Sequence, residues 1–304
     1  MYHVYHTTKK VQPLAIALEV DGHVVGILIA QIMWNGGMIG KPLTGRSIII
    51  GGPLAIDNDK DVLEMLMEAY RRSLPKWVVY SEIRPVYDIS DLMSEKFKEL
   101  ARWKRVGHYN LVLRVDRSEE ELWNGMHKER RRNVGQAEKA GLRFEEVTND
   151  AGRKDVVALL RKTYERKNVP MADDSLFAHL IEIMPKYVHF FAAYKEEIMV
   201  AGQIRLGHKD LLYAWYAGSD EEYFKLRPND FTMWNVICWA HGEGYKWFDF
   251  GGGGEPGKPY GVRDYKLKYG CEMYDYGRYV LAHRPITYTM AKVAYNLYHK
   301  IKGK

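Results

Sequence analysis

The sequence contains few cysteines and no long apolar run. Its 304 residues include two cysteines, Cys238 and Cys271, which are too few for a disulfide framework or a zinc site. No apolar run reaches the roughly 18 residues that a membrane-spanning helix requires, and the N-terminus lacks the pattern of a signal peptide. We therefore expect a soluble, cytoplasmic protein.

The sequence also lacks the signatures of metal-dependent and nucleophilic catalysis. Its eleven histidines are not spaced as metal ligands, and no Gly-x-Ser-x-Gly elbow occurs. We interpret His108, His179 and His241 as residues that make local hydrogen bonds. The sequence therefore predicts no metal site and no organic cofactor.

Composition and charge set the outer bounds. Hydrophobic residues make up 46% of the chain, which is enough for one large or two medium domains with real cores. The formal net charge of +6 favours anionic partners such as phosphates, nucleic acid or a membrane surface. This charge bears on association and does not identify a reaction.

One order of elements, a hairpin followed by a strand, a helix and a strand, occurs twice. The apolar pattern predicts the first copy at 14–20, 24–33, 47–50, 59–73 and 77–83. It predicts the second copy at 188–193, 199–206, 211–217, 230–243 and 246–250. Both copies place a Lys-Trp pair at the start of the last strand, Lys76-Trp77 and Lys246-Trp247. The repeat predicts two α/β domains of one kind.

Three further helices are expected outside the repeat. A basic helix at 118–140 begins with a Ser118–Glu121 capping box and carries the charge run Arg130–Arg132. A second helix covers 155–167, with Arg166 at the edge of its apolar stripe. The last helix, at 286–301, is amphipathic, and we expect it to pack on the first domain. The run Arg130–Arg132 is interpreted as a solvated helix face. Binding to nucleic acid or to a membrane is the alternative for both basic segments.

The most informative stretch is residues 246–270, KWFDFGGGGEPGKPYGVRDYKLKYG. Four consecutive glycines follow a strand, and glycine backbone can approach a ligand closely. The alternation at 265–269 predicts a strand with Lys266 and Lys268 on one face. A lysine beside donor-rich backbone suits an anionic ligand or a developing oxyanion. The alternative is a loop followed by an edge strand with solvated lysines.

Several separated blocks resemble the Fem family of peptidoglycan-bridge aminoacyltransferases. They are LWNGMHKERRRNVGQAEKAGLRFEEV, LLRKTYERKNVP, PNDFTMWNVICWAHGEG with KWFDFGG, and YKLKYG. The resemblance implies an α/β fold with two tandem GNAT-like (acyl-CoA N-acyltransferase-like) domains and mixed central sheets. The first domain would comprise residues 1–113 plus 281–304, because the final segment of Fem proteins folds back on it. The second would comprise residues 114–280.

The resemblance also implies an activity. Fem proteins transfer an amino acid from aminoacyl-tRNA to an amine of a peptidoglycan precursor, either lipid-linked or nucleotide-linked. Lys266 matches the family's catalytic-region lysine and would stabilise the oxyanion, while Tyr265 would position the aminoacyl end. With a lipid-linked precursor, the enzyme would work at the inner membrane surface as a peripheral protein.

The remaining candidate residues surround the same cleft of the implied fold. Arg166 matches an arginine that contacts phosphates of the nucleotide-linked precursor, a task that suits a guanidinium fork. Asp249 either accepts a proton or orients the amine, or else caps the glycine loop as a strand-end carboxylate. The other candidates for substrate binding are Tyr216, Lys268 and Tyr269.

The sequence departs from the family at three places. It begins almost directly in the first hairpin, the segment 143–156 leaves no room for a helical arm, and residues 82–85 read Glu-Ile-Arg-Pro. The last departure leaves a differently shaped anionic acceptor open. A GNAT-type N-acyltransferase acting on another cell-envelope or small-molecule amine is the alternative function. Acetyl-coenzyme A is disfavoured as donor, because neither central helix follows an Arg/Gln-x-x-Gly-x-Gly/Ala turn.

Overall fold

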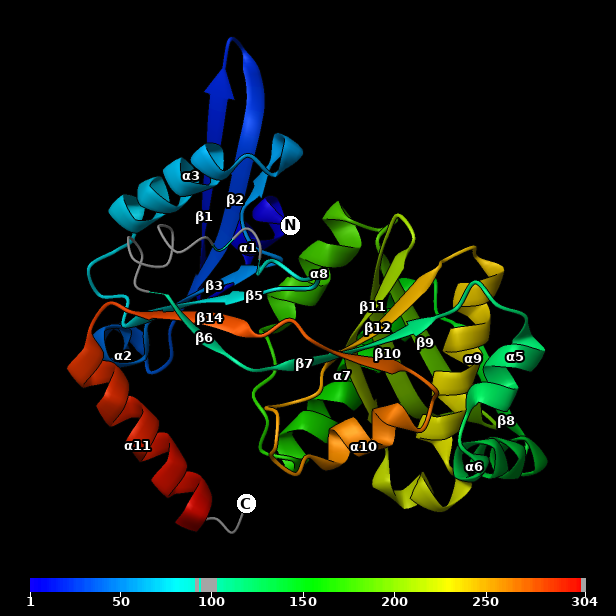
Figure 1. Ribbon diagram of the computed structural model, residues 1–304. Helices are drawn as coiled ribbons and strands as arrows, with labels where there is room; N and C mark the ends of the chain where they lie inside the picture. Colours follow the sequence, from blue (N-terminus) through cyan, green and yellow to red (C-terminus); the bar gives the residue numbers. More distant parts are fainter. Residues whose placement is uncertain (91–92, 94–102, 302–304) are drawn as a thin grey trace. The chain divides into compact units, whose positions relative to one another are not determined.

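The chain folds into two α/β units (Figure 1). The computed structural model describes residues 1–90, 93 and 103–301. One unit comprises Met1–His108 and Asp275–Lys304, and the other comprises Tyr109–Tyr274. The sequence predicts these boundaries at 113/114 and 280/281. Among the described helices, none is long and apolar enough to cross a membrane.

The first unit is built on a mixed sheet with the strand order β1-β2-β3-β5-β14-β6. The strands are β1 (Val11–Val20), β2 (His23–Met33), β3 (Arg46–Ile50), β4 (Leu54–Ala55, paired with β2), β5 (Tyr80–Arg84), β6 (Lys104–Val106) and β14 (Arg278–Ala282). The helices are α1 (Tyr2–Thr7), α2 (Gly37–Thr44), η1 (Ile56–Asn58), α3 (Lys60–Ser73) and α11 (Pro285–Ile301). Strands β3 and β5 are parallel neighbours in the sheet, and α3 lies between them in the sequence. Strand β14, from the last part of the chain, pairs with β5 and so belongs to this sheet.

Helix α3 supplies much of the core of the first unit. Asp59 caps it by accepting hydrogen bonds from the backbone of Asp61 and Val62. Its buried face includes Tyr70, whose hydroxyl bonds to Ser47 and Ser81 at 2.6 Å each. Because these serines lie on β3 and β5, the contact fixes the helix on the parallel pair.

The second unit has the strand order β13-β7-β12-β11-β10-β9-β8. The strands are β7 (Tyr109–Arg114), β8 (Leu142–Glu146), β9 (Val188–Lys195), β10 (Ile198–His208), β11 (Leu211–Ser219), β12 (Trp247–Gly252) and β13 (Glu272–Asp275). The helices are α5 (Glu119–Gly125), α6 (Lys128–Lys139), α7 (Asp150–Arg166), α8 (Asp174–Ile183), η2 (Glu221–Leu226), α9 (Pro228–Gly242) and α10 (Gly261–Leu267). The predicted hairpin, strand, helix and strand are thus present in both units, and the predicted fold class is confirmed.

The parallel strands β11 and β12 pair over a short length only. Their register joins Leu211–Tyr213 to Trp247–Asp249, although β11 continues to Ser219. Beyond that point β11 carries a bulge opposite β10. Ile204 pairs with Tyr216 and Arg205 pairs with Ala214, so Trp215 is left without a partner. On its other side β12 pairs with β7 from Trp247 onward, and after an irregularity beyond Asp249 its end still pairs there, Gly252 with Asn110.

Two local predictions are wrong. The helix expected at 118–140 is two helices, because the chain leaves the helical conformation at Met126 and His127 before α6 begins. The strand expected at 265–269 is the end of α10 followed by a turn, with Tyr269 N–H bonding to Lys266 O at 3.0 Å. The alternation of aromatic and lysine residues fits a strand, but Tyr265 and Tyr269 are also spaced for one helix face.

Candidate functional site

An acidic and a basic side chain converge at the end of β12. Asp249 lies on this strand with 1% of its surface exposed. Its carboxylate accepts a hydrogen bond of 2.6 Å from the N–H of Gly251, which the positive φ of that glycine (73°) turns back toward the strand. Burial raises the pKa of Asp249 to about 6, although the hydrogen bond from Gly251 opposes the shift.

Lys266 comes to the same place from α10. Its Nζ donates a hydrogen bond of 2.8 Å to the carbonyl oxygen of Gly252. Burial lowers the pKa of Lys266 to about 8, and the nearby Asp249 carboxylate acts in the opposite direction. At neutral pH the lysine is therefore mostly cationic, yet close enough to its pKa to change charge near physiological conditions.

The glycine run that follows β12 forms part of this site. Gly253 N–H donates to Tyr109 O at 2.6 Å, and Tyr109 N–H donates to Gly254 O at 2.9 Å. A Cβ on Gly253 would lie 2.4 Å from the Leu111 side chain, so a larger residue does not fit there. The guanidinium of Arg263 donates to Gly253 O and to Lys258 O. The run is thus hydrogen-bonded to β7 and tied to the following loop, unlike a phosphate cradle with free backbone N–H groups.

Arg205 is a buried cation that the sequence does not reveal as part of the site. It lies on β10 with none of its surface exposed, and no carboxylate among the described residues pairs with it. Its guanidinium donates to the backbone oxygens of Ile204 and Tyr216, while its Nε has no partner among the described residues. Burial lowers its pKa to about 9. Its charge also acts to lower the pKa of Lys266.

Tyr265 and Tyr269 belong to a buried network centred on Asp230. Their hydroxyls lie 2.9 Å apart, and Tyr269 donates to the Asp230 carboxylate at 2.7 Å. That carboxylate also accepts from Arg130 at 2.5 Å and from Asn133 at 2.7 Å. The Arg130 guanidinium lies 4.6 Å from the centre of the Tyr265 ring. The network joins α6, α9 and α10 beneath the site.

These contacts bear on three of the predicted site residues. Tyr269 is buried with its hydroxyl bonded to Asp230 and Tyr265, so its contacts in the structure are those of an anchor of α10. Lys268 pairs with Glu129 of α6 at 2.6 Å. Tyr265 is half-buried, and its hydroxyl and ring take part in the Asp230 network. The structure therefore brings Lys266 and Asp249 together, whereas Tyr265, Lys268 and Tyr269 make contacts toward α6 and Asp230.

Arg166 and Tyr216 lie where α7 meets β11. Arg166 contacts Glu221 at 3.3 Å, donates a long hydrogen bond of 3.5 Å to Ser219 O and lies over the Phe224 ring. The Tyr216 ring packs against Tyr164, with ring centres 5.4 Å apart, and burial raises its pKa to about 12. Arg205 connects this region with the end of β12, because it bonds to Tyr216 O and acts electrostatically on Lys266.

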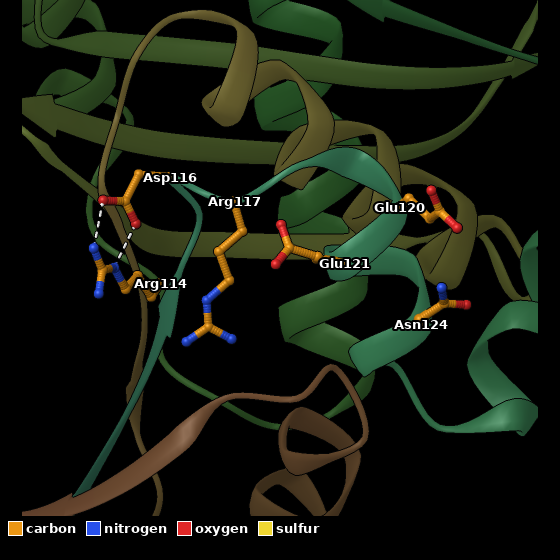
Figure 2. Close-up of a pocket in the computed structure, with 6 residues that line it drawn as sticks. All are labelled: Arg114, Asp116, Arg117, Glu120, Glu121 and Asn124. Atoms are coloured by element: carbon orange, nitrogen blue, oxygen red, sulfur yellow. Dashed lines mark hydrogen bonds and ion pairs between the residues drawn. The ribbon is translucent and has the colours of Figure 1, made fainter.

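A separate hollow in the surface of the second unit is lined by charged side chains. Figure 2 shows its six residues, which come from the end of β7, from the connection that follows it and from α5: Arg114, Asp116, Arg117, Glu120, Glu121 and Asn124. The guanidinium of Arg114 and the carboxylate of Asp116 form a two-pronged ion pair, and Glu121 completes the Ser118 capping box. The hollow contains none of the predicted site residues. Within the described part of the chain, no group of three His, Cys, Asp or Glu residues could hold a metal ion.

Comparison with known proteins identifies the class of the second unit. Residues 125–267 match a family described as an acetyltransferase (GNAT) domain. The second unit is a GNAT-type acyltransferase domain. The matched residues include α9, β12 and α10. Of the elements that form the site, only β7 lies outside the match. The predicted enzyme class, an acyltransferase, is confirmed. No curated protein matches the sequence.

Solved structures extend the likeness to both units. FemX is similar over 92% of this chain and 90% of its own, with a TM-score of 0.70 and 16% identity. L-PGS from Bacillus licheniformis is similar over 96% of this chain and 91% of its own, with a TM-score of 0.61 and 13% identity. A tandem GNAT protein from the clavulanic acid biosynthesis pathway is similar over 91% and 84%, with a TM-score of 0.56 and 11% identity. At these identities the likeness shows the fold, and the predicted resemblance to Fem proteins is confirmed at that level.

The raised pKa of Asp249 predicts that this carboxylate lowers the stability of the fold. Because its pKa is about 6 in the folded state and 3.8 ordinarily, the unfolded chain ionises first, and stability falls as pH rises from about 4 to about 6. Asp249→Asn keeps an oxygen to accept the Gly251 N–H and removes the charge. We expect the variant to be more stable than wild type at pH 7 by about 1–3 kcal/mol, and equally stable near pH 4.

Urea unfolding at the two pH values measures this difference. A variant that is less stable than wild type at pH 7 would instead identify Asp249 as a structural cap of the glycine loop. Asp116→Asn is the control, because the carboxylate of Asp116 is exposed to solvent and its replacement should change stability little at either pH.

Proposed function

We propose that this protein is an aminoacyltransferase that moves an amino acid from aminoacyl-tRNA to an amine of a peptidoglycan precursor, lipid-linked or nucleotide-linked. The observation that carries the proposal is the half-buried Lys266 beside Asp249 at the end of β12, within a GNAT-type domain. The resemblance of the YKLKYG block to the Fem element that contains the catalytic-region lysine supports the choice of donor.

The reaction is the aminolysis of an ester. The neutral acceptor amine attacks the carbonyl carbon that joins the amino acid to the tRNA ribose, and the carbonyl oxygen becomes an oxyanion. Lys266 carries three N–H donors, of which one bonds to Gly252 O, so two remain for that oxyanion. A preorganised donor of this kind contributes about 3–4 kcal/mol to transition-state stabilisation. Collapse of the tetrahedral intermediate forms the amide and expels the ribose oxygen.

Asp249 supplies the negative charge of the site. With a pKa of about 6 it is ionised at neutral pH, and it can accept the proton that the attacking amine loses. The same charge opposes the desolvation of Lys266 and keeps that lysine cationic at neutral pH. Arg205 acts the other way and adds to the larger effect of burial, which lowers the pKa of Lys266.

Arg166 is suited to hold the acceptor. Its contacts with Glu221 and with Ser219 O are long, so a phosphate of the precursor can replace them without breaking a tight ion pair. The neighbouring rings of Tyr164 and Tyr216 offer an aromatic wall at the same end of β11. These groups would bind the acceptor, while Lys266 and Asp249 act on the reacting atoms.

The second candidate is an N-acyltransferase that uses acyl-coenzyme A on another cell-envelope or small-molecule amine. One similar structure is that of a tandem GNAT protein without AcCoA. Coenzyme A phosphates need free backbone N–H groups at the start of the central helix. Here α9 begins with Pro228, which has no N–H, after Arg227 in a left-handed conformation. This start favours a donor other than coenzyme A.

Transfer of radiolabelled amino acids from a mixed pool of charged tRNAs tests the proposal. The acceptors would be lipid-linked and nucleotide-linked precursors. We expect wild type to transfer label and Lys266→Ala to lose on the order of a hundredfold in rate or more, because the oxyanion loses its cation. Lys258→Ala, which removes the same charge from an exposed pair with Glu255, is the matched control. A wild-type protein inactive on every acceptor, or a Lys266→Ala variant as active as the control, would contradict the proposal.

The two shifted pKa values predict a bell-shaped pH profile. The rate should rise through about pH 6, as Asp249 ionises, and fall through about pH 8, as Lys266 loses its proton. Lys266→Arg keeps a cation at high pH, so its alkaline limb should move upward while the acidic limb stays near 6. Initial rates of transfer across pH 5–10, with one acceptor for both proteins, measure the limbs. An alkaline limb at the same pH in both proteins would exclude Lys266 as its source.

A further inference from the structure

Helix α11 presents a stripe of aliphatic side chains to solvent. Ile286, Met290, Val293 and Leu297 are 79%, 67%, 61% and 56% exposed. Their spacing of four, three and four residues places them on one face of the helix. Figure 1 shows α11 (red) continuing from the first unit past α2. The prediction that this helix packs its apolar side on the first domain is wrong for these four residues.

The opposite face of α11 holds the helix to the first unit. The Tyr288 ring packs against Tyr80 with ring centres 5.2 Å apart, and Arg284, just before the helix, donates to Pro42 O at 2.7 Å. At about 100° per residue, Tyr288 lies roughly 160° from the direction of the aliphatic stripe. Tyr288 thus lies on the side of the helix opposite the aliphatic stripe, and its contact with Tyr80 leaves that stripe exposed.

The charge of this segment is of one sign. Residues 285–304 contain four lysines, at 292, 300, 302 and 304, and no aspartate or glutamate. Three tyrosines, at 288, 295 and 298, complete the helix sequence, and this ring type favours the boundary between water and lipid. An aliphatic stripe in a segment whose sequence contains tyrosines and only basic charges is typical of a helix that lies on an anionic membrane surface.

We propose that α11 docks this protein on an anionic phospholipid bilayer, with Ile286, Met290, Val293 and Leu297 inserted among the headgroups. A second copy of the chain is a poorer occupant, because residues 285–304 carry four lysines and no acidic residue, so two copies of the segment repel each other. Four side chains also offer much less than the roughly 800 Å² per partner of a stable protein interface. The inference stands apart from the proposed transferase reaction, since it concerns only where the protein resides.

Co-sedimentation of the full chain with vesicles tests the proposal. One set of vesicles contains phosphatidylcholine alone, and the other contains about one third phosphatidylglycerol. The informative pair of variants is Val293→Glu and Ala291→Glu, which make the same change of charge at two exposed positions roughly 160° apart on the helix. Circular dichroism and thermal unfolding check that both variants fold as wild type does.

We expect wild type to bind the anionic vesicles, with weaker binding at higher salt, and to bind the neutral vesicles poorly. Val293→Glu should bind at least about tenfold more weakly than Ala291→Glu, because only Val293 enters the apolar layer. Wild type that stays in the supernatant with anionic vesicles, or equal binding by the two variants, would overturn the proposal. A dimer in sedimentation velocity that Val293→Glu dissolves would also overturn it, in favour of a subunit interface. The assay contains no donor or acceptor, so its result is independent of the transfer assay.

Discussion

The site depends on one shared carboxylate. Asp230, near the start of α9, accepts hydrogen bonds from Arg130 of α6, from Asn133 of α6 and from Tyr269 beyond α10. A buried carboxylate needs such partners, and each partner is itself buried and would be left unsatisfied without it. The bond to Tyr269 fixes the end of α10, and this placement brings Lys266 to the carbonyl of Gly252. The position of Lys266 therefore depends on a buried carboxylate, Asp230, that holds the end of α10.

Positive charge exceeds negative charge beneath the site. Arg205 is buried without a carboxylate partner among the described residues, and Lys266 lies within reach of its field. Among the groups that act on Lys266, Asp249 is the one carboxylate. The Cys271 thiol also acts on it, but burial raises the pKa of this thiol and keeps it neutral. Such an arrangement is costly at rest, because desolvation penalises each charge. It is stabilised when an anion forms nearby, which is what the aminolysis of an ester produces.

Much of the architecture can be predicted from the sequence, because the local spacing of apolar residues indicates the strands and helices. The alternation in 14–33 and 188–206 predicts the two hairpins, and the stripe in 59–73 predicts α3. The strand predicted at 265–269 fails because Tyr265 and Tyr269 satisfy both periods, and a distant partner, Asp230, selects the helix. The sequence around Arg205 does not indicate that this residue is buried. Its guanidinium contacts Gln203 on the same strand, but also Tyr216 on β11 and Met233 on α9, which the fold alone brings to it. Lys266 is found through the YKLKYG block, whereas its partner Gly252 O emerges only in three dimensions.

The central claim is that the fold holds Lys266 as a cation whose pKa is far below that of an ordinary lysine. NMR titration of the side-chain Cε carbons, in protein labelled with ¹³C-lysine, measures this directly. We expect one lysine to titrate near pH 8, to be absent from Lys266→Arg and to titrate lower still in Asp249→Asn, where the opposing carboxylate charge is gone. Titration of Lys266 near its ordinary value of 10.5 would contradict the account.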